Sequence, residues 1–306
     1  MGLRRLIGLI VSGSIFFPLY LFSQEHGASR LRVNSDLVLV PVTVSDPHDH
    51  PVTGLTKDSF RLFDNGVQQT ISHFSLDDAP ITVGMVFDTS GSMRFGMDRS
   101  RMAADALVLT GNPQDEYFLV DFANSAQLSV PPTRNVKEIE NRISQIHPYG
   151  HTALLDAVYL ALNQARKSRL GRRALLVISD GGDNASRYTR TEVEQLLREC
   201  DVPIYAIGVF TQHSHRTSEE SDGPSLLRKI AEASGGRMIP VNDATEIPYM
   251  AVKLGLEMRT RYVLGFSPGE VPCNGRYHKV RVEVVAPFGL PPLRASWRSG
   301  YYAPSE

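Results

Sequence analysis

Apolar runs alternate with amphipathic segments from residue 81 to about residue 261, and this alternation constrains the fold more than any other feature of the sequence. The apolar runs are short and hydrophobic throughout, which is typical of strands buried on both faces of a parallel sheet. We therefore predict an α/β fold of the doubly wound, Rossmann-like kind, with a mainly parallel sheet flanked by helices. Strands are predicted at residues 83–88, 116–122, 173–180, 203–210 and 237–241, and helices at residues 99–109, 136–146, 152–167, 191–199, 225–233 and 244–261.

A polar motif directly follows the apolar run of the first predicted strand. Asp88, Ser90 and Ser92 occupy alternate positions, and Gly91 lies between the two serines. Alternate side chains of a nearly extended backbone point the same way, while glycine permits a tight turn. Because ligands of open α/β sheets bind at the carboxyl ends of the strands, the motif indicates a nest of oxygen atoms for a hard cation.

Two later residues are predicted to lie at the same edge of the sheet. Thr152 is in the loop that opens the predicted helix at 152–167, and Asp180 ends the predicted strand at 173–180. Mg²⁺ prefers oxygen ligands in octahedral geometry, so three hydroxyls and two carboxylates suit it, with Mn²⁺ and Ca²⁺ as the alternatives. The competing interpretation is that Ser92 and Thr152 cap the helices they precede.

The order of these residues resembles the metal-ion-dependent adhesion site (MIDAS) of the von Willebrand factor A (VWA) family, which is written D-x-S-x-S, then T, then D. The matching residues are Asp88, Ser90, Ser92, Thr152 and Asp180. The resemblance implies that the three hydroxyls touch Mg²⁺ directly and that the two carboxylates act largely through water. It also implies that the open coordination position accepts an Asp or Glu carboxylate of a partner.

Phrases outside the motif resemble those of a VWFA-related family described chiefly from acidobacterial genomes; they lie at residues 37–42, 52–60, 262–266 and 300–304. This family has an export signal and a single A domain, and it brings no established ligand. His151 departs from the pattern, because comparable relatives usually carry Gly before the Thr.

Residues 1–24 are predicted to be a signal peptide. Arg4 and Arg5 precede the apolar run 6–22, and Ser23 offers a small residue before polar sequence. We therefore expect an exported protein that is periplasmic, cell-surface or secreted. Since Leu21 and Ser23 make an imperfect cleavage site, an uncleaved signal segment is the one membrane attachment that the sequence suggests.

Two β segments flank the predicted VWA domain at residues 80–258. The first covers residues 30–76 and includes an Asn65-Gly66 hairpin turn with a returning strand predicted at residues 69–74. The second covers residues 261–304. Neither segment has enough strands to be stable alone, so we expect them to pair with each other. The prediction is a small split β-sandwich-like domain into which the VWA domain is inserted.

The function predicted from these features is divalent-cation-dependent protein–protein or adhesive binding, with an unidentified protein or matrix ligand that presents Asp or Glu. The alternative is a metal-independent structural or assembly scaffold of the cell envelope. A less favoured alternative is a metal-assisted hydrolase, which would need His151 as its general base. Because a lone His in such a loop is more often solvated or hydrogen-bonded to the backbone, we expect no enzymatic activity. The net charge of −1 and the dispersed basic residues argue against nucleic-acid binding.

Three smaller expectations concern polar and sulfur-containing side chains. Asp183 and Asn184 are expected to form an Asx turn rather than to tune a metal. His213 and His215 are expected to be solvated. The two cysteines, Cys200 and Cys273, fall in different predicted domains and are expected to be separate thiols.

Overall fold

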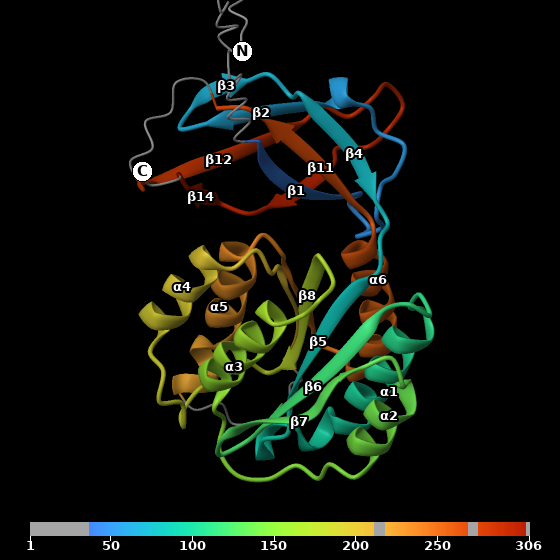
Figure 1. The fold of residues 1–306 in the computed structure, drawn as a ribbon. Coiled ribbons are helices and arrows are strands. Elements are labelled where there is room, and N and C mark those ends of the chain that lie inside the picture. Colours follow the sequence, from blue (N-terminus) through green and yellow to red (C-terminus); the bar gives the residue numbers. More distant parts are fainter. Residues whose placement is uncertain (1–36, 211–217, 269–274, 304–306) are drawn as a thin grey trace, which may run out of the picture. The chain divides into compact units, whose positions relative to one another are not determined.

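The structure is a computed structural model that describes residues 37–210, 218–268 and 275–303 (Figure 1). The chain divides into two units, Met1–Ser35 and Asp36–Glu306. The predicted signal peptide lies outside the described residues, as do His213, His215 and Cys273. Within the described ranges, no helix combines the length and the apolar character needed to cross a membrane.

A six-stranded sheet forms the centre of the α/β domain, with strand order β10-β9-β8-β5-β6-β7. All neighbouring strands are parallel except β7, which runs antiparallel to β6. The bounds are β5 (Ile81–Asp88), β6 (Glu116–Phe122), β7 (Ala126–Thr133), β8 (Arg172–Ser179), β9 (Ile204–Val209) and β10 (Met238–Val241). The sequence analysis includes no strand at β7, because this edge strand exposes much of its length and contains two prolines.

Helices cover both faces of this sheet (Figure 1). One face packs on α1 (Met97–Leu109), α2 (Val136–Ser144) and α6 (Ile247–Arg259). The opposite face packs on α3 (Leu154–Arg166), α4 (Arg190–Glu199) and α5 (Ser218–Ala233). The predicted α/β fold with a flanked, mainly parallel sheet is therefore confirmed.

Strand β5 is buried along its whole length at the centre of the sheet. Val83, Met85 and Phe87 face the core that contains α1. Gly84 faces the other side, where an added Cβ would lie 2.2 Å from Phe118 Cζ and 2.5 Å from Leu175 Cδ2. Only glycine leaves room for these two large side chains to meet across the strand.

Two four-stranded antiparallel sheets are built from the segments before and after the α/β domain. Their strand orders are β13-β1-β11-β4 and β14-β12-β2-β3. Strand β1 pairs with β11 and β13, and β2 pairs with β12, so strands from both ends of the chain share each sheet. One hydrophobic core contains residues of both sheets. The bounds are β1 (Val38–Ser45), β2 (Phe60–Asp64), β3 (Val67–Gln69), β4 (His73–Asp77), β11 (Arg261–Phe266), β12 (Tyr277–Val284), β13 (Arg294–Trp297) and β14 (Gly300–Tyr302).

The predicted hairpin turn at Asn65 and Gly66 is present, and both residues have positive φ angles of 47° and 85°. The returning strand differs from the sequence analysis, which places it as one continuous strand over residues 69–74. Instead β3 ends at Gln69, and a separate strand β4 begins at His73 and joins the other sheet. Two short strands in different sheets share one stretch of β-type sequence, so the pattern alone did not separate them.

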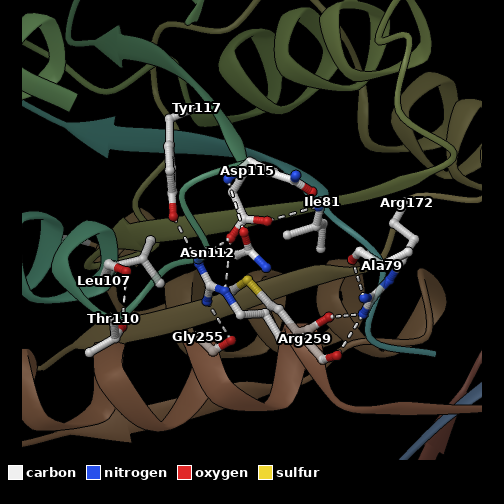
Figure 2. A network of polar contacts seen from close by, with 12 residues as sticks. Ala79, Ile81, Leu107, Thr110, Asn112, Asp115, Tyr117, Arg172, Gly255 and Arg259 are labelled. Atoms are coloured by element: carbon white, nitrogen blue, oxygen red, sulfur yellow. Dashed lines mark hydrogen bonds and ion pairs between the residues drawn. The ribbon is translucent and has the colours of Figure 1, made fainter. Parts of the chain in front are cut away.

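A buried polar network lies where the chain enters and leaves the α/β domain (Figure 2). The carboxylate of Asp115 accepts hydrogen bonds from the backbone N–H groups of Ile81 and Asn112, each at 2.9 Å, and from Arg259 Nε at 3.0 Å. Arg259 also donates to Tyr117 Oη at 2.8 Å. The network therefore joins the first residue of β5, the loop before β6 and the last turn of α6.

Cys200 follows the last residue of α4 and is a buried free thiol. Burial raises the pKa of this thiol above its ordinary value. It therefore packs as a small apolar side chain rather than acting as a reactive nucleophile.

Candidate metal centre

The predicted site lies where the strand order of the central sheet reverses direction. Strands β5 and β8 are neighbours, with Phe87 opposite Ile178. The helix that follows β5 covers one face of the sheet, whereas the helix that follows β8 covers the other. Loops that leave toward opposite faces open a crevice at the carboxyl ends of the strands. Asp88 ends β5 and Asp180 directly follows β8. Both residues therefore lie at this edge of the sheet, as the sequence pattern predicts.

Asp88 is completely buried. Its Oδ1 accepts a hydrogen bond from the backbone N–H of Ser90 at 2.9 Å, and its Oδ2 accepts one from Ser179 Oγ at 2.5 Å. Burial, followed by the negative charge of Asp180, raises the pKa of Asp88 to about 7. Asp180 is half-buried. A buried carboxylate that is repelled by a second one nearby is an arrangement that a bound cation would stabilise.

The side chains of the two serines of the motif contact each other. Ser90 Oγ and Ser92 Oγ are 3.0 Å apart and share a hydrogen bond. Ser90 precedes a short 3₁₀ helix, η2 (Gly91–Phe95), and its side chain makes no capping bond there. The N-cap of the following helix α1 is Gly96, so Ser92 does not cap it. The helix-cap interpretation of Ser92 is therefore wrong.

Thr152 is buried and lies in the loop before α3. The N-cap of α3 is Ala153, so the hydroxyl of Thr152 does not hold that position. Asn184 fixes the Thr152 backbone from both sides: its Oδ1 accepts from the Thr152 N–H at 2.9 Å, and its N–H donates to the Thr152 carbonyl at 2.9 Å. This pairing links the Thr152 loop to the loop that follows Asp180.

The Thr152 loop is also joined to the serine motif through the backbone. The N–H of Gly91 donates to the carbonyl of Gly150 at 3.2 Å, and the N–H of Tyr149 donates to the carbonyl of Thr89 at 2.8 Å. The three loops that carry the five predicted ligands are thus held side by side by hydrogen bonds. That the five side chains on these loops hold a metal ion stays a prediction.

Several supporting residues escaped the sequence analysis. Ser179 binds the buried oxygen of Asp88, and Asn124 Oδ1 accepts from the backbone N–H of His151 at 2.7 Å. Gly150 has a φ angle of 70°, and an added Cβ there would lie 2.4 Å from Asn124 Oδ1. These contacts join residues far apart in the chain, so no local pattern indicates them. For Ser179, the signal in the sequence was its position immediately before Asp180, one of the predicted ligands.

Asp183 and Asn184 do not form the expected Asx turn, because their side chains make other hydrogen bonds. Asp183 Oδ1 accepts from Ser186 Oγ at 2.5 Å and from the backbone N–H of Leu155 at 3.3 Å. Both side chains thus hold the Asp180 loop against the start of α3. Short polar side chains can bond their own loop or a neighbouring one, and here the neighbour lies close enough to compete.

The donor set consists mostly of hydroxyl oxygens. The described part of the chain contains no group of three or more His, Cys, Asp or Glu side chains that could hold a metal ion. A metal at this edge would therefore depend on Ser90, Ser92 and Thr152 together with the two carboxylates. All five offer hard oxygen atoms, which fit Mg²⁺ better than a soft or imidazole-preferring metal.

Residues 83–182 match the family model of the von Willebrand factor type A domain, and this stretch includes all five predicted ligands. The chain contains a von Willebrand factor type A domain. The VWA domain is thus established on about a third of the sequence, and the central sheet described above extends beyond it.

An uncharacterised protein of Borreliella burgdorferi is 23% identical over 184 residues, which cover 55% of this chain and 52% of that protein. The chain thus spans about half the length of this curated relative. A von Willebrand factor type A structure from Catenulispora acidiphila has a TM-score of 0.51 and 11% identity, covering 81% of this chain and 74% of that one. The vWF domain of the type V pili tip protein Mfa5 from Porphyromonas gingivalis has a TM-score of 0.46 and 11% identity, covering 63% and 98%.

Proposed function

We propose that this protein binds an acidic side chain of another protein or of a matrix component through a Mg²⁺ ion held at the VWA domain. The observation that carries the proposal is the convergence of Asp88, Asp180 and the two loops that bear the three hydroxyls at the switch point of the sheet. VWA domains commonly take part in protein–protein or adhesive interactions. The chemistry of the donor set supports the same function here.

Ser90, Ser92 and Thr152 are proposed to contact the ion directly, and Asp88 and Asp180 are proposed to act largely through water. When bound, Mg²⁺ supplies an electrophilic position that accepts a carboxylate oxygen, because its direct protein ligands are neutral. The chain's own part is to hold these oxygens in place. Ser179 and the backbone of Ser90 fix the Asp88 carboxylate, and Asn184 fixes the Thr152 loop.

A binding role is proposed in place of a catalytic one. A hydrolase would need a positioned general base within hydrogen-bond reach of the attacked water. His151 is exposed, and its backbone N–H donates to Asn124 Oδ1, a bond that does not orient its ring. The proposal is therefore a non-enzymatic adhesive module.

The proposal also places the protein outside the cytoplasm and assigns the flanking sheets to one domain. The support for export is the basic and apolar pattern of residues 1–24. The support for a split β-sandwich-like domain is the pairing of β1 with β11 and of β2 with β12, which joins segments on either side of the VWA domain. Such a domain would present the metal edge while its own surface stays available for other contacts.

Surface plasmon resonance against an immobilised Glu-rich peptide tests the proposed recognition. The expected result is binding in Mg²⁺ that disappears in EDTA, and that the Thr152→Ala variant lacks. Thr70→Ala is the matched control, since Thr70 is exposed and lies outside the VWA domain. Binding that persists in EDTA, or that Thr152→Ala retains in full, would refute the proposal.

A further inference from the structure

A cavity in the molecule is lined by residues that lie outside the predicted metal site. It has a volume of about 620 Å³, within the range of small-ligand pockets. Strands β12 and β13 and the turn between β2 and β3 form most of its wall, and the end of α5 contributes Glu232. Its lining residues include none of the five predicted metal ligands, so it is independent of the VWA site.

One wall of this cavity contains the indole of Trp297. Trp297 Nε1 donates a hydrogen bond to the carbonyl of Val280 at 3.0 Å, which fixes the orientation of the ring. The ring remains partly exposed. A fixed, partly exposed indole offers a flat apolar surface at little entropic cost, and the C–H face of a ring-shaped ligand can pack against it.

Polar groups of both signs surround the indole. Lys279 and Glu232 both line the cavity and are exposed. Neither side chain forms an ion pair with another residue in the ranges that the structure describes. Lys279 therefore offers hydrogen-bond donors and Glu232 offers acceptors, and both are available to a ligand.

The other charge in the lining is already neutralised. The guanidinium of Arg281 forms an ion pair with Glu283 and lies over the ring of Phe63, with its Cζ atom 3.8 Å from the ring centroid. The available charges, Lys279 and Glu232, then balance each other. A balanced pair disfavours a strongly charged ligand such as a phosphate, because one of the two groups would always repel it.

Uncharged hydrogen-bonding groups complete the lining. Ser296 and Ser299 carry hydroxyls, and Asn65 carries an amide whose Oδ1 accepts from the Lys279 N–H at 2.9 Å. These groups donate and accept hydrogen bonds without net charge. A ligand that matches them must carry many neutral hydroxyl groups beside an apolar ring face.

We propose that this cavity binds a neutral saccharide, which packs one sugar ring on Trp297 and hydrogen-bonds to Lys279 and Glu232. The class follows from the combination of a fixed indole, balanced charges and hydroxyl-bearing neighbours. The β sheets would then carry a second binding activity beside that of the VWA domain. This activity does not depend on Mg²⁺.

Trp297 is the single tryptophan of the 306-residue chain, so its fluorescence reports on this cavity alone. The experiment is a titration of the full chain with maltotriose, cellotriose and chitotriose, followed by indole emission, with sodium sulfate at matched ionic strength as the anionic comparison. The expected result is a saturable change with at least one saccharide, equal in Mg²⁺ and in EDTA. Sulfate is expected to produce no saturable change.

Two variants test the assigned contacts. Lys279→Ala and Glu232→Gln change exposed side chains, so both are expected to fold, and each is expected to weaken saccharide binding at least about tenfold. Lys137→Ala, an exposed lysine on α2, is the matched control and is expected to bind as the wild type does. No response to any of the three saccharides, unchanged affinity in both cavity variants, or a saturable response to sulfate alone would each overturn the proposal.

Discussion

Replacing Asp115 with Ala should destabilise the VWA domain more than a typical surface substitution, because this carboxylate is the centre of the network in Figure 2. Its side chain is 1% exposed, and it accepts bonds from two backbone N–H groups and from Arg259. The guanidinium of Arg259 is 15% exposed and would keep its bonds to Tyr117 and Gly255 but lose its counter-ion. The substitution therefore leaves a buried charge without its partner.

Breaking a buried ion pair from one side costs about 3–5 kcal/mol in free energy of unfolding. For a domain of this size, about 2–4 °C of melting temperature is lost per kcal/mol, so the variant should melt roughly 6–20 °C below the wild type. The assay is thermal and urea unfolding followed by far-UV circular dichroism, which does not depend on Trp297.

Asp98→Ala is the matched control for this prediction. Asp98 also pairs with an arginine, Arg101, at 2.7 Å, but its side chain is 88% exposed. An exposed pair contributes at most about 1 kcal/mol, so this variant should melt close to the wild type. If Asp115→Ala unfolds no more easily than Asp98→Ala, the reasoning about burial at this network is wrong.

Three further predictions concern packing, burial of charge and pH. Gly84→Ala should cost about 1–3 kcal/mol by overpacking, and an unchanged urea midpoint would contradict the close contacts at that strand. Glu257→Gln should cost several kcal/mol, on the order expected for a broken buried pair, because Glu257 is 2% exposed and binds Arg237 Nη2 at 2.7 Å; the urea midpoint measures this. In EDTA, the wild type should lose stability as the pH rises from 3.8, the ordinary pKa of an Asp carboxyl, to about 7, the pKa of Asp88 in the folded protein. The reason is that the raised pKa makes the folded protein favour the protonated carboxyl, which is lost over this pH range. Asp88→Asn should lack this loss, and parallel melting curves of the two proteins from pH 4 to pH 8 would count against the repulsion at the site.

The four inner strands of the central sheet, β9, β8, β5 and β6, could be predicted within one or two residues because they are buried on both faces. Strand β5 has no exposed residue, so its sequence is apolar without interruption and ends at Asp88. Strand β7 carries no such signal, since it lies at the edge of the sheet and only Val130 of its eight residues is buried. An exposed edge strand such as β7 is therefore the part of this sheet that the hydrophobic pattern misses, whereas the pattern did predict the other edge strand, β10.

The candidate site shows the same division between local and long-range information. Asp88, Ser90 and Ser92 form one local motif, and the parallel order of β5 and β8 explains why Asp180 joins them. The bonds made by Asn184 and Asn124 connect loops about thirty residues apart in the chain. Their partners depend on how the loops fold against each other, which no periodicity in the sequence encodes.

Isothermal titration of Mg²⁺ into the purified wild-type protein and into Asp88→Ala, side by side, tests the central claim most directly. The account predicts one saturable Mg²⁺ site in the wild type and none in the variant, with both proteins showing the same circular dichroism spectrum. Mg²⁺ affinity that is equal in the two folded proteins would contradict the claim that Asp88 and its neighbours form the metal site.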